Sequence, residues 1–238
     1  TTGRIPFRNV PAGSAHLPDR TRCHGAIAMN PLMEPAKERS CKQDAGCVVL
    51  SAGRSGRMGT PKALLPFPPG GTYMSHIIDA YLASGIGTIA LVVAPSIPTE
   101  PYERMPGVII VRNPDPDLGR SHSLRLGLAA LPNVRHCFIQ NIDNPFVERT
   151  LIEGLYAARN EAPYITPQHK GRSGHPVLID RSMIECVLAG FGRDTPLNLL
   201  FSGFDRHRIP TDDPRVLVNI NTPEDHSKHC TPGLHHAC

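Results

Sequence analysis

Residues 48–67 read VVLSAGRSGRMGTPKALLPF, a stretch in which three glycines, two arginines and one lysine lie between two apolar runs. The β-branched run that leads into it, GCVVLS (46–51), predicts a short buried strand. Glycines let the backbone turn tightly and bring its N–H groups close to an anion, and Arg57 and Lys62 add positive charge. The stretch therefore predicts a phosphate-binding loop at the end of a strand.

The glycine spacing separates this loop from two common phosphate-binding motifs. Gly53, Gly56 and Gly59 give the pattern G-x-x-G-x-x-G, whereas dinucleotide-binding loops read G-x-G-x-x-G. Neither Gly56 nor Gly59 is followed by the Lys-Ser or Lys-Thr pair of the Walker motif. The alternative is a surface turn whose basic residues are only solvated, and the strand directly before the loop argues against it.

Apolar runs and helical patterns alternate after the loop. Continuous apolar runs, typical of strands buried on both faces, occupy 88–94, 107–111 and 136–142. Apolar residues at helical spacing occupy 73–85, 121–132 and 145–160, with Pro145 in the first turn of the last helix. This order predicts an α/β fold with a three-layer, doubly wound, mostly parallel sheet of Rossmann-like type. Ligands of such sheets bind beyond the carboxyl ends of the strands, where the glycine-rich loop lies.

The two ends and the second half of the chain are less regular. Runs at 162–167, 175–179 and 215–220 predict strands, and residues 180–190 predict a helix. Residues 1–44 hold five prolines and no apolar period, which predicts a disordered leader. We expect one folded domain over 45–227. Residues 228–238 are expected to form a flexible tail, whose His and Cys spacing matches no defined zinc module.

Composition limits the classes of partner. The net charge of +4 comes from scattered basic residues, and the chain has no Trp and five Tyr, so nucleic-acid binding is not expected. No apolar run approaches the roughly 20 residues of a membrane-spanning helix, so a soluble, cytoplasmic protein without a membrane partner is expected. The seven cysteines include no C-x-x-C pair and are expected to be free thiols.

The loop and four later segments together resemble the MobA-like nucleotidyltransferases, which include the molybdenum-cofactor cytidylyltransferases and guanylyltransferases. LSAGRSGRMGTPK (50–62) is similar to the family pattern L-A-A-G-x-S-x-R-M-G-x-P-K, with Ser51 replacing the first alanine. The later segments follow in the family's order: GRSHSLRLGL (119–128), NIDNPFV (141–147), GRSGHPVLI (171–179) and VNINTPED (218–225). Five ordered segments are a far more specific signal than any one of them.

The resemblance implies transfer of a nucleoside monophosphate from a nucleoside triphosphate to a phosphorylated acceptor such as molybdopterin, with release of pyrophosphate. Ala52 favours CTP over GTP, because the cytidylyltransferases read L-A-A-G where the guanylyltransferases read L-A-G-G. A molybdoenzyme or its chaperone is the protein partner that the resemblance implies. Two alternatives stay open: a nucleotidyltransferase for a sugar or polyol phosphate, and a catalytically weakened nucleotide-binding homologue.

The resemblance also assigns roles to residues. Arg57 and Lys62 match the basic pair that holds the triphosphate. The positions that match the nucleotide-binding segment are Leu50, Ser51, Ala52, Gly53, Gly56, Gly59 and Ser123. The positions that match the acceptor-substrate segment are Gly174, His175 and Pro176. For His175 a purely structural role is the equal alternative, and the exposed Arg112 and Arg120 are expected to be only solvated.

Two positions concern a metal ion. Asp143 matches the magnesium-binding aspartate of the family, the alternative being a cap on the helix predicted from Pro145. Asn221 stands where the family commonly has a second metal-binding aspartate, and Asn219 replaces the other aspartate of that segment. An amide oxygen can bind Mg²⁺ but brings no negative charge, so the ion would depend more on Asp143 and the triphosphate. Asp225 is expected to cap the turn that follows.

Overall fold

The structure is a computed structural model that describes residues 42–53, 56–131, 133–189 and 197–230. All but the last three residues of the predicted leader (1–44) lie outside the described residues, and so do residues 231–238 of the predicted tail. Residues 228–230 of that tail belong to the last turn of a helix, α6 (Pro223–Cys230).

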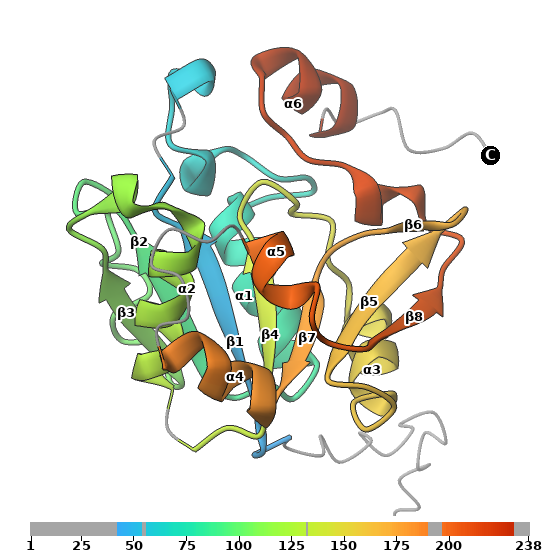
Figure 1. The fold of residues 1–238 in the computed structure, drawn as a ribbon. Helices are drawn as coiled ribbons and strands as arrows, with labels where there is room; N and C mark the ends of the chain where they lie inside the picture. The colour runs from blue at the N-terminus through green and yellow to red at the C-terminus, as the bar shows by residue number, and fades with distance from the viewer. Residues whose placement is uncertain (1–41, 54–55, 132, 190–196, 231–238) are drawn as a thin grey trace, which may run out of the picture. The chain divides into compact units, whose positions relative to one another are not determined.

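Within the described residues, one sheet of eight strands organises the fold (Figure 1). The strands are β1 (Ala45–Ser51), β2 (Ile89–Val93), β3 (Val108–Arg112), β4 (His136–Asn141), β5 (Tyr164–His169), β6 (Arg172–Ser173), β7 (Val177–Asp180) and β8 (Arg206–Pro210). Their order is β3-β2-β1-β4-β7-β5-β6, with β8 beside β5. The first four strands are parallel, whereas β7 runs antiparallel to both β4 and β5. The predicted mostly parallel α/β sheet is confirmed.

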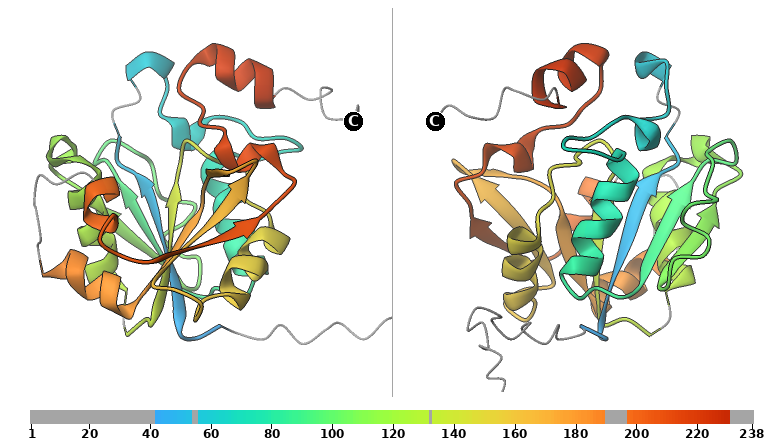
Figure 2. Two further views of the ribbon diagram at one scale, coloured as in Figure 1. Left: turned by 45° about the vertical axis from the view of Figure 1, so that its right-hand side comes forward. Right: turned by 180° about the vertical axis from the view of Figure 1, so that it is seen from behind.

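Helices cover both faces of the sheet (Figure 2). The helices are α1 (Tyr73–Ala83), α2 (Gly119–Ala130), α3 (Arg149–Ala157), α4 (Arg181–Leu188), α5 (Leu197–Phe201) and α6; the short 3-10 turns are η1 (Gly56–Met58), η2 (Lys62–Leu64), η3 (Pro116–Leu118) and η4 (Pro214–Leu217). Side chains alternate along a strand, so Val49 packs on the side of α1 and α3 while Val48 packs on the side of α2 and α4. All of β1 is buried, which explains its continuous apolar sequence.

Helix α3 begins at Arg149 rather than in the turn at Pro145, so the predicted start is wrong. Phe146 and Val147 are almost fully buried in the core, and the chain runs without helical structure through them. The N-cap residue is Glu148, which makes no side-chain cap bond. Tertiary packing of two apolar side chains thus outweighs the preference of proline for a first helical turn.

The second half departs further from the prediction. Residues 215–220 were expected to form a strand. Instead, the 3-10 turn η4 covers residues 215–217, and residues 218–220 belong to no strand. The Asn144 amide donates to the carbonyl oxygens of Arg215, Val216 and Val218, so it bonds groups that a neighbouring strand would otherwise satisfy. Strand β8, at Arg206–Pro210, was not predicted because its sequence RHRIP lacks an apolar run.

Two expectations drawn from composition can be compared with the structure. None of the helices in the described part of the chain is long and apolar enough to span a bilayer. The four cysteines within the described ranges are free thiols: Cys47, Cys137, Cys186 and Cys230.

Candidate nucleotide-binding site

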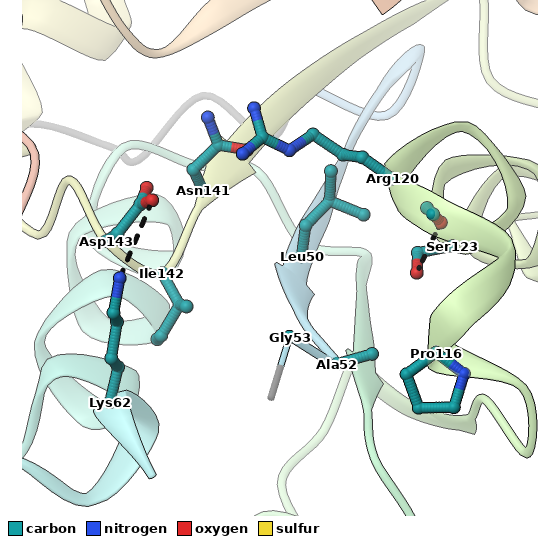
Figure 3. A pocket seen from close by; sticks show the side chains of 11 residues that line it. Leu50, Ala52, Gly53, Lys62, Pro116, Arg120, Ser123, Asn141, Ile142 and Asp143 are labelled. Carbon is teal, nitrogen blue, oxygen red and sulfur yellow. Dashed lines mark hydrogen bonds and ion pairs between the residues drawn. The ribbon is translucent and has the colours of Figure 1, made fainter. Parts of the chain in front are cut away.

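A cavity of about 290 Å³ opens at the carboxyl ends of β1 and β4 (Figure 3). Its walls come from the end of β1, the η2 turn, the first turn of α2 and the turn after β4. Leu50 and Ala52 line it because alternate residues of an extended chain face the same side, and Gly53 follows them. Ser51 is buried but belongs to the opposite face, and its side chain is not part of this lining.

Lys62 reaches one wall of the cavity from η2. Its Nζ donates to Asn221 Oδ1 at 2.8 Å and lies 3.8 Å from Asp143 Oδ2. The Lys62 side chain is only 12% exposed, and this burial lowers its pKa, an effect that Asp143 opposes and that the charges of Arg57 and Arg120 reinforce. A lysine side chain with few water contacts at a cavity wall is suited to bind a phosphate.

Asn221 is fixed in place by the start of α6. Asp225 Oδ2 accepts hydrogen bonds from the backbone N–H groups of Asn221 and Thr222, at 2.9 and 3.0 Å. The expected capping role of Asp225 is therefore confirmed. Helix α6 is in turn fastened to α1, because Tyr73 Oη lies 2.7 Å from His226 Nδ1 and 3.2 Å from Cys230 Sγ.

Asp143 and Asn221 provide the oxygen atoms that a divalent cation would need. Asp143 Oδ1 is buried and has no hydrogen-bond partner among the described residues. Because a buried carboxylate oxygen without a partner is costly, this atom fits a cation ligand. Asp143 does not cap α3, which begins at Arg149. No cluster of three or more His, Cys, Asp or Glu occurs within the described ranges, so the protein would offer one carboxylate and one amide oxygen.

Ser123 lines the cavity from α2 and is held by a buried asparagine. Asn113 Nδ2 donates to Ser123 Oγ at 3.0 Å, and Asn113 Oδ1 accepts from the backbone N–H of Asp115 at 2.9 Å. A second cavity of about 370 Å³ shares Ala52, Gly53 and Pro116 with the first, so the two adjoin. Together they offer room for a ligand larger than a phosphate.

The glycine-rich loop is only partly described, since Arg54 and Ser55 lie outside the described residues. Gly56 and Arg57 lie on the exposed η1 turn, and Gly59 has a positive φ of 66°. Arg57 is not part of the cavity lining, although its charge affects the pKa of Lys62. The structure therefore places Lys62 inside the cavity and Arg57 outside it.

The segment Gly174-His175-Pro176 lies behind the cavity rather than in its wall. A Cβ on Gly174 would lie 2.3 Å from the Val216 carbonyl oxygen, so close packing against η4 requires glycine there. Pro176 is buried. His175 is half-buried, and Asn141 Nδ2 lies 3.4 and 3.3 Å from its Nδ1 and Nε2. Burial lowers the pKa of His175, with Asp143 opposing and Arg120 reinforcing the shift.

Two cavity residues with polar side chains were not predicted from the sequence. Arg120 was expected to be only solvated, but α2 begins at Gly119 and its first turn brings Arg120 into the cavity wall. Asn141, the last residue of β4, also lines the cavity. The sequence feature that could have identified Asn141 is a polar residue at the end of an apolar strand. Arg112, by contrast, donates to the carbonyl oxygens of Pro95 and Ile97 and therefore stabilises the loop that contains them.

A mostly parallel sheet whose strand ends carry a glycine-rich loop, a largely buried lysine and an aspartate with one unbonded oxygen defines an α/β nucleotide-binding protein. The chain belongs to the MobA-like NTP transferase family, because the model of the MobA-like NTP transferase domain matches residues 47–202.

Relatives and solved structures agree with this assignment. The chain is 27% identical to the molybdenum cofactor cytidylyltransferase of Escherichia coli K12, over 75% of this chain and 92% of the relative. It is 31% identical to a probable molybdenum cofactor guanylyltransferase of Mycobacterium tuberculosis H37Rv, over 74% and 88%. The crystal structure of Rv0371c from M. tuberculosis H37Rv has the same fold, with a TM-score of 0.64 at 23% identity over 77% of this chain and 96% of that chain. Rv0371c has also been solved in complex with manganese.

Proposed function

We propose that this protein is a nucleotidyltransferase that transfers CMP from CTP to a phosphorylated acceptor such as molybdopterin and releases pyrophosphate. The observation that carries the proposal is the pair of Lys62 and Asp143 in the cavity wall, with Asn221 bonded to Lys62 beside it, where a phosphate and a cation would both be held. Family membership supports the nucleotidyltransferase class. The choice of CTP rests on Ala52, and the choice of molybdopterin as acceptor is supported by the molybdenum cofactor transferases among the relatives.

The reaction joins two phosphates. An oxygen of the acceptor phosphate forms a bond to the α-phosphorus of the nucleotide, and the bond from that phosphorus to the bridging oxygen of the β-phosphate breaks. Pyrophosphate leaves with the electron pair of that bond. Because negative charge increases on the departing oxygens, catalysis consists mainly of positioning and charge neutralisation. Lys62 would hold the triphosphate inside the cavity, and Arg57 would approach the leaving pyrophosphate from the η1 turn.

The metal would be Mg²⁺, held by Asp143 and Asn221. Its remaining ligands would be phosphate oxygens and water, since the protein offers one carboxylate and one amide oxygen here. When bound, the ion neutralises charge on the phosphates. The manganese complex of Rv0371c supports use of a divalent cation in a protein of the same fold.

The proposed preference for CTP rests on Ala52. This residue is buried and its methyl group lies in the wall that the two adjoining cavities share. A methyl group there narrows the cavity, which favours the smaller pyrimidine over a purine. GTP is the second candidate, because the guanylyltransferase from M. tuberculosis is 31% identical.

The direct test is thermal unfolding of the full chain with CTP, GTP, ATP and UTP, each with and without Mg²⁺. A triphosphate at about 100 times its Kd stabilises the folded state by about 2.7 kcal/mol. For a chain of this length we therefore expect CTP with Mg²⁺ to raise the Tm by about 5–10 °C. An equal or larger shift with GTP would overturn the CTP preference, and no shift with any triphosphate would overturn the proposed function.

Turnover is tested separately by measuring pyrophosphate release with CTP, Mg²⁺ and molybdopterin. Lys62→Met should abolish release, whereas Lys170→Met changes an exposed lysine in the β5–β6 turn, away from the cavity, and should leave it unchanged. Release with a sugar phosphate but not with molybdopterin would favour the sugar-phosphate alternative. Triphosphate binding without any release would favour a binding protein without turnover.

A further inference from the structure

Arg120 and Lys62 approach the cavity from different elements. Lys62 comes from η2 and contacts Asn221, whereas Arg120 comes from the first turn of α2. Figure 3 shows Arg120 extending across the cavity toward Asn141, with Asp143 between that pair and Lys62. The cavity therefore carries two cationic groups on two different walls.

Asn141 adds a buried polar group to the cavity wall on which Arg120 lies. Its side chain is polar and only 6% exposed, although it ends a strand whose other residues are largely apolar. It lines the cavity, and its Nδ2 is directed at the His175 ring at 3.3 and 3.4 Å. With its nitrogen facing His175, the amide is held in one orientation at the cavity wall. A buried amide in contact with a cavity is a group that can hydrogen-bond to a ligand.

His175 lies behind this amide and is held by the main chain. Its backbone N–H donates to the Val216 carbonyl oxygen at 2.9 Å, and Gly174 beside it packs against the same residue. The charge of Arg120 contributes to the lowered pKa of His175, after burial of the ring. His175 therefore orients Asn141, and it acts as a positioning residue rather than as a wall of the cavity.

We propose that Arg120 and Asn141, the latter oriented by His175, form the subsite for the phosphate of the acceptor, on the wall across Asp143 from Lys62. The ligand class is a phosphomonoester. This inference rests on the proposed function, because it assigns one of the two phosphates of that reaction to a place in the cavity.

The chemistry of the reaction requires two such walls. A phosphomonoester carries a charge near −2 at neutral pH and is repelled by the triphosphate that it must attack. Lys62, Arg57 and the metal would neutralise the triphosphate, so a separate positive partner for the acceptor phosphate lowers the repulsion that remains as the two anions approach. Arginine presents a planar fork that can bind two phosphate oxygens, which a lysine cannot reproduce. Lys62 on the triphosphate and Arg120 on the acceptor satisfy this requirement.

The test uses phenyl phosphate as the phosphomonoester and α,β-methylene-CTP with Mg²⁺ as the unreactive nucleotide, each titrated into the full chain by calorimetry. Arg120→Met should raise the Kd for phenyl phosphate by at least about tenfold and change the Kd for the nucleotide by less than about twofold. Arg120→Lys should recover part of the loss. Asn141→Asp keeps the size of the side chain and places a negative charge in the subsite. It should therefore raise the Kd for phenyl phosphate as much as Arg120→Met does.

Arg125→Met is the matched control, because Arg125 lies on the same helix, contacts His122 and is not part of the cavity lining. It should leave both Kd values unchanged. In turnover with molybdopterin, His175→Gln should raise the KM for the acceptor more than the KM for CTP.

Three results would overturn the assignment: no phenyl phosphate binding by the unaltered protein, an equal loss in Arg125→Met, or a loss of nucleotide affinity in Arg120→Met with phenyl phosphate unaffected. The last result would assign Arg120 to the nucleotide. Failure of the nucleotide to bind the unaltered protein would overturn the proposed function instead. Phenyl phosphate titrated alone then still decides whether Arg120 and Asn141 bind a phosphomonoester.

Discussion

Asn221 and Asn219 are the same residue type in very different surroundings. Asn221 is partly buried and accepts a hydrogen bond from Lys62, while Asn219 is exposed. We expect Asn221→Asp to bind Mn²⁺ about tenfold more tightly, because a second carboxylate adds negative charge beside Asp143. Mn²⁺ binding is measured by the loss of the free-ion signal in electron paramagnetic resonance, which requires no turnover.

Asn219→Asp is the matched control for this change. It adds the same charge to the same segment, but on an exposed side chain, so its Mn²⁺ affinity should stay within about twofold of the unaltered protein. Equal tightening in both variants would mean that overall charge, and not a ligand position, controls binding. That outcome would remove Asn221 from the proposed metal site.

At the scale of the elements, α2 carries Arg120 and Ser123 to the cavity and must lie close to the sheet to do so. Gly127 permits this approach, since a Cβ there would lie 2.5 Å from Val48 Cγ1. Gly127→Ala should therefore lower the free energy of unfolding by about 1–3 kcal/mol. Because α2 is displaced, the Gly127→Ala variant should also bind α,β-methylene-CTP more weakly. Urea unfolding and calorimetry measure the two effects.

Helix α3 offers the matching control. Gly154 also lies within a helix, but a Cβ there would have no heavy atom within 4 Å. Gly154→Ala should raise the free energy of unfolding by about 0.5–1 kcal/mol, because alanine loses less conformational entropy in a helix. If Gly127→Ala were equally stabilising, close packing of α2 on β1 would not constrain that position.

For the molecule as a whole, the first half of the fold could be predicted from the sequence because each element is specified locally. The run GCVVLS is buried along its entire length in β1, and α1 begins after Thr72, whose side chain accepts a bond from the Ser75 N–H. The end of this half was not specified locally. Burial of Phe146 and Val147 delays α3 to Arg149, and such burial depends on the assembled core.

The second half depends on contacts between distant segments. The run 215–220 has the composition of a strand, but Asn144 bonds three of the carbonyl groups around it, and that partner lies more than 70 residues away in sequence. Strand β8 reads RHRIP and, in the described part of the chain, pairs with β5 alone, so neither an apolar run nor two-sided burial marks it. Periodicity detects buried elements, whereas these segments are specified by their partners.

The candidate site shows the same division. Lys62, Asp143, Ser123 and the end of β1 were nominated from motifs, and the structure brings them to one cavity. The contact of Lys62 with Asn221 joins residues 159 positions apart, a grouping that the order of motifs suggests but cannot establish. Arg120 was missed because an exposed arginine in a sequence does not reveal the helix turn that directs it.

Three histidines distributed over the molecule predict how its stability depends on pH. Burial lowers the pKa of His76, His136 and His175 below the usual 6.5, in spite of nearby carboxylates. Below about pH 6.5 the unfolded chain therefore binds protons that the folded chain does not, so acid favours unfolding. Three aspartates also have a lowered pKa, namely Asp44, Asp213 and Asp225. They lose their contribution to stability only when the pH falls below 3.8, so the pH dependence near neutrality comes from the histidines.

The free energy of unfolding should accordingly fall as the pH is lowered from about 7.5 to about 5.5, the range in which the unfolded chain takes up these protons first. Urea unfolding at several pH values measures the slope. His175→Gln removes one of the three groups and keeps an amide beside Asn141, so its slope should be smaller. A free energy that is constant or rises on acidification would contradict the argument, because it would require the folded chain to bind these protons at least as tightly as the unfolded chain.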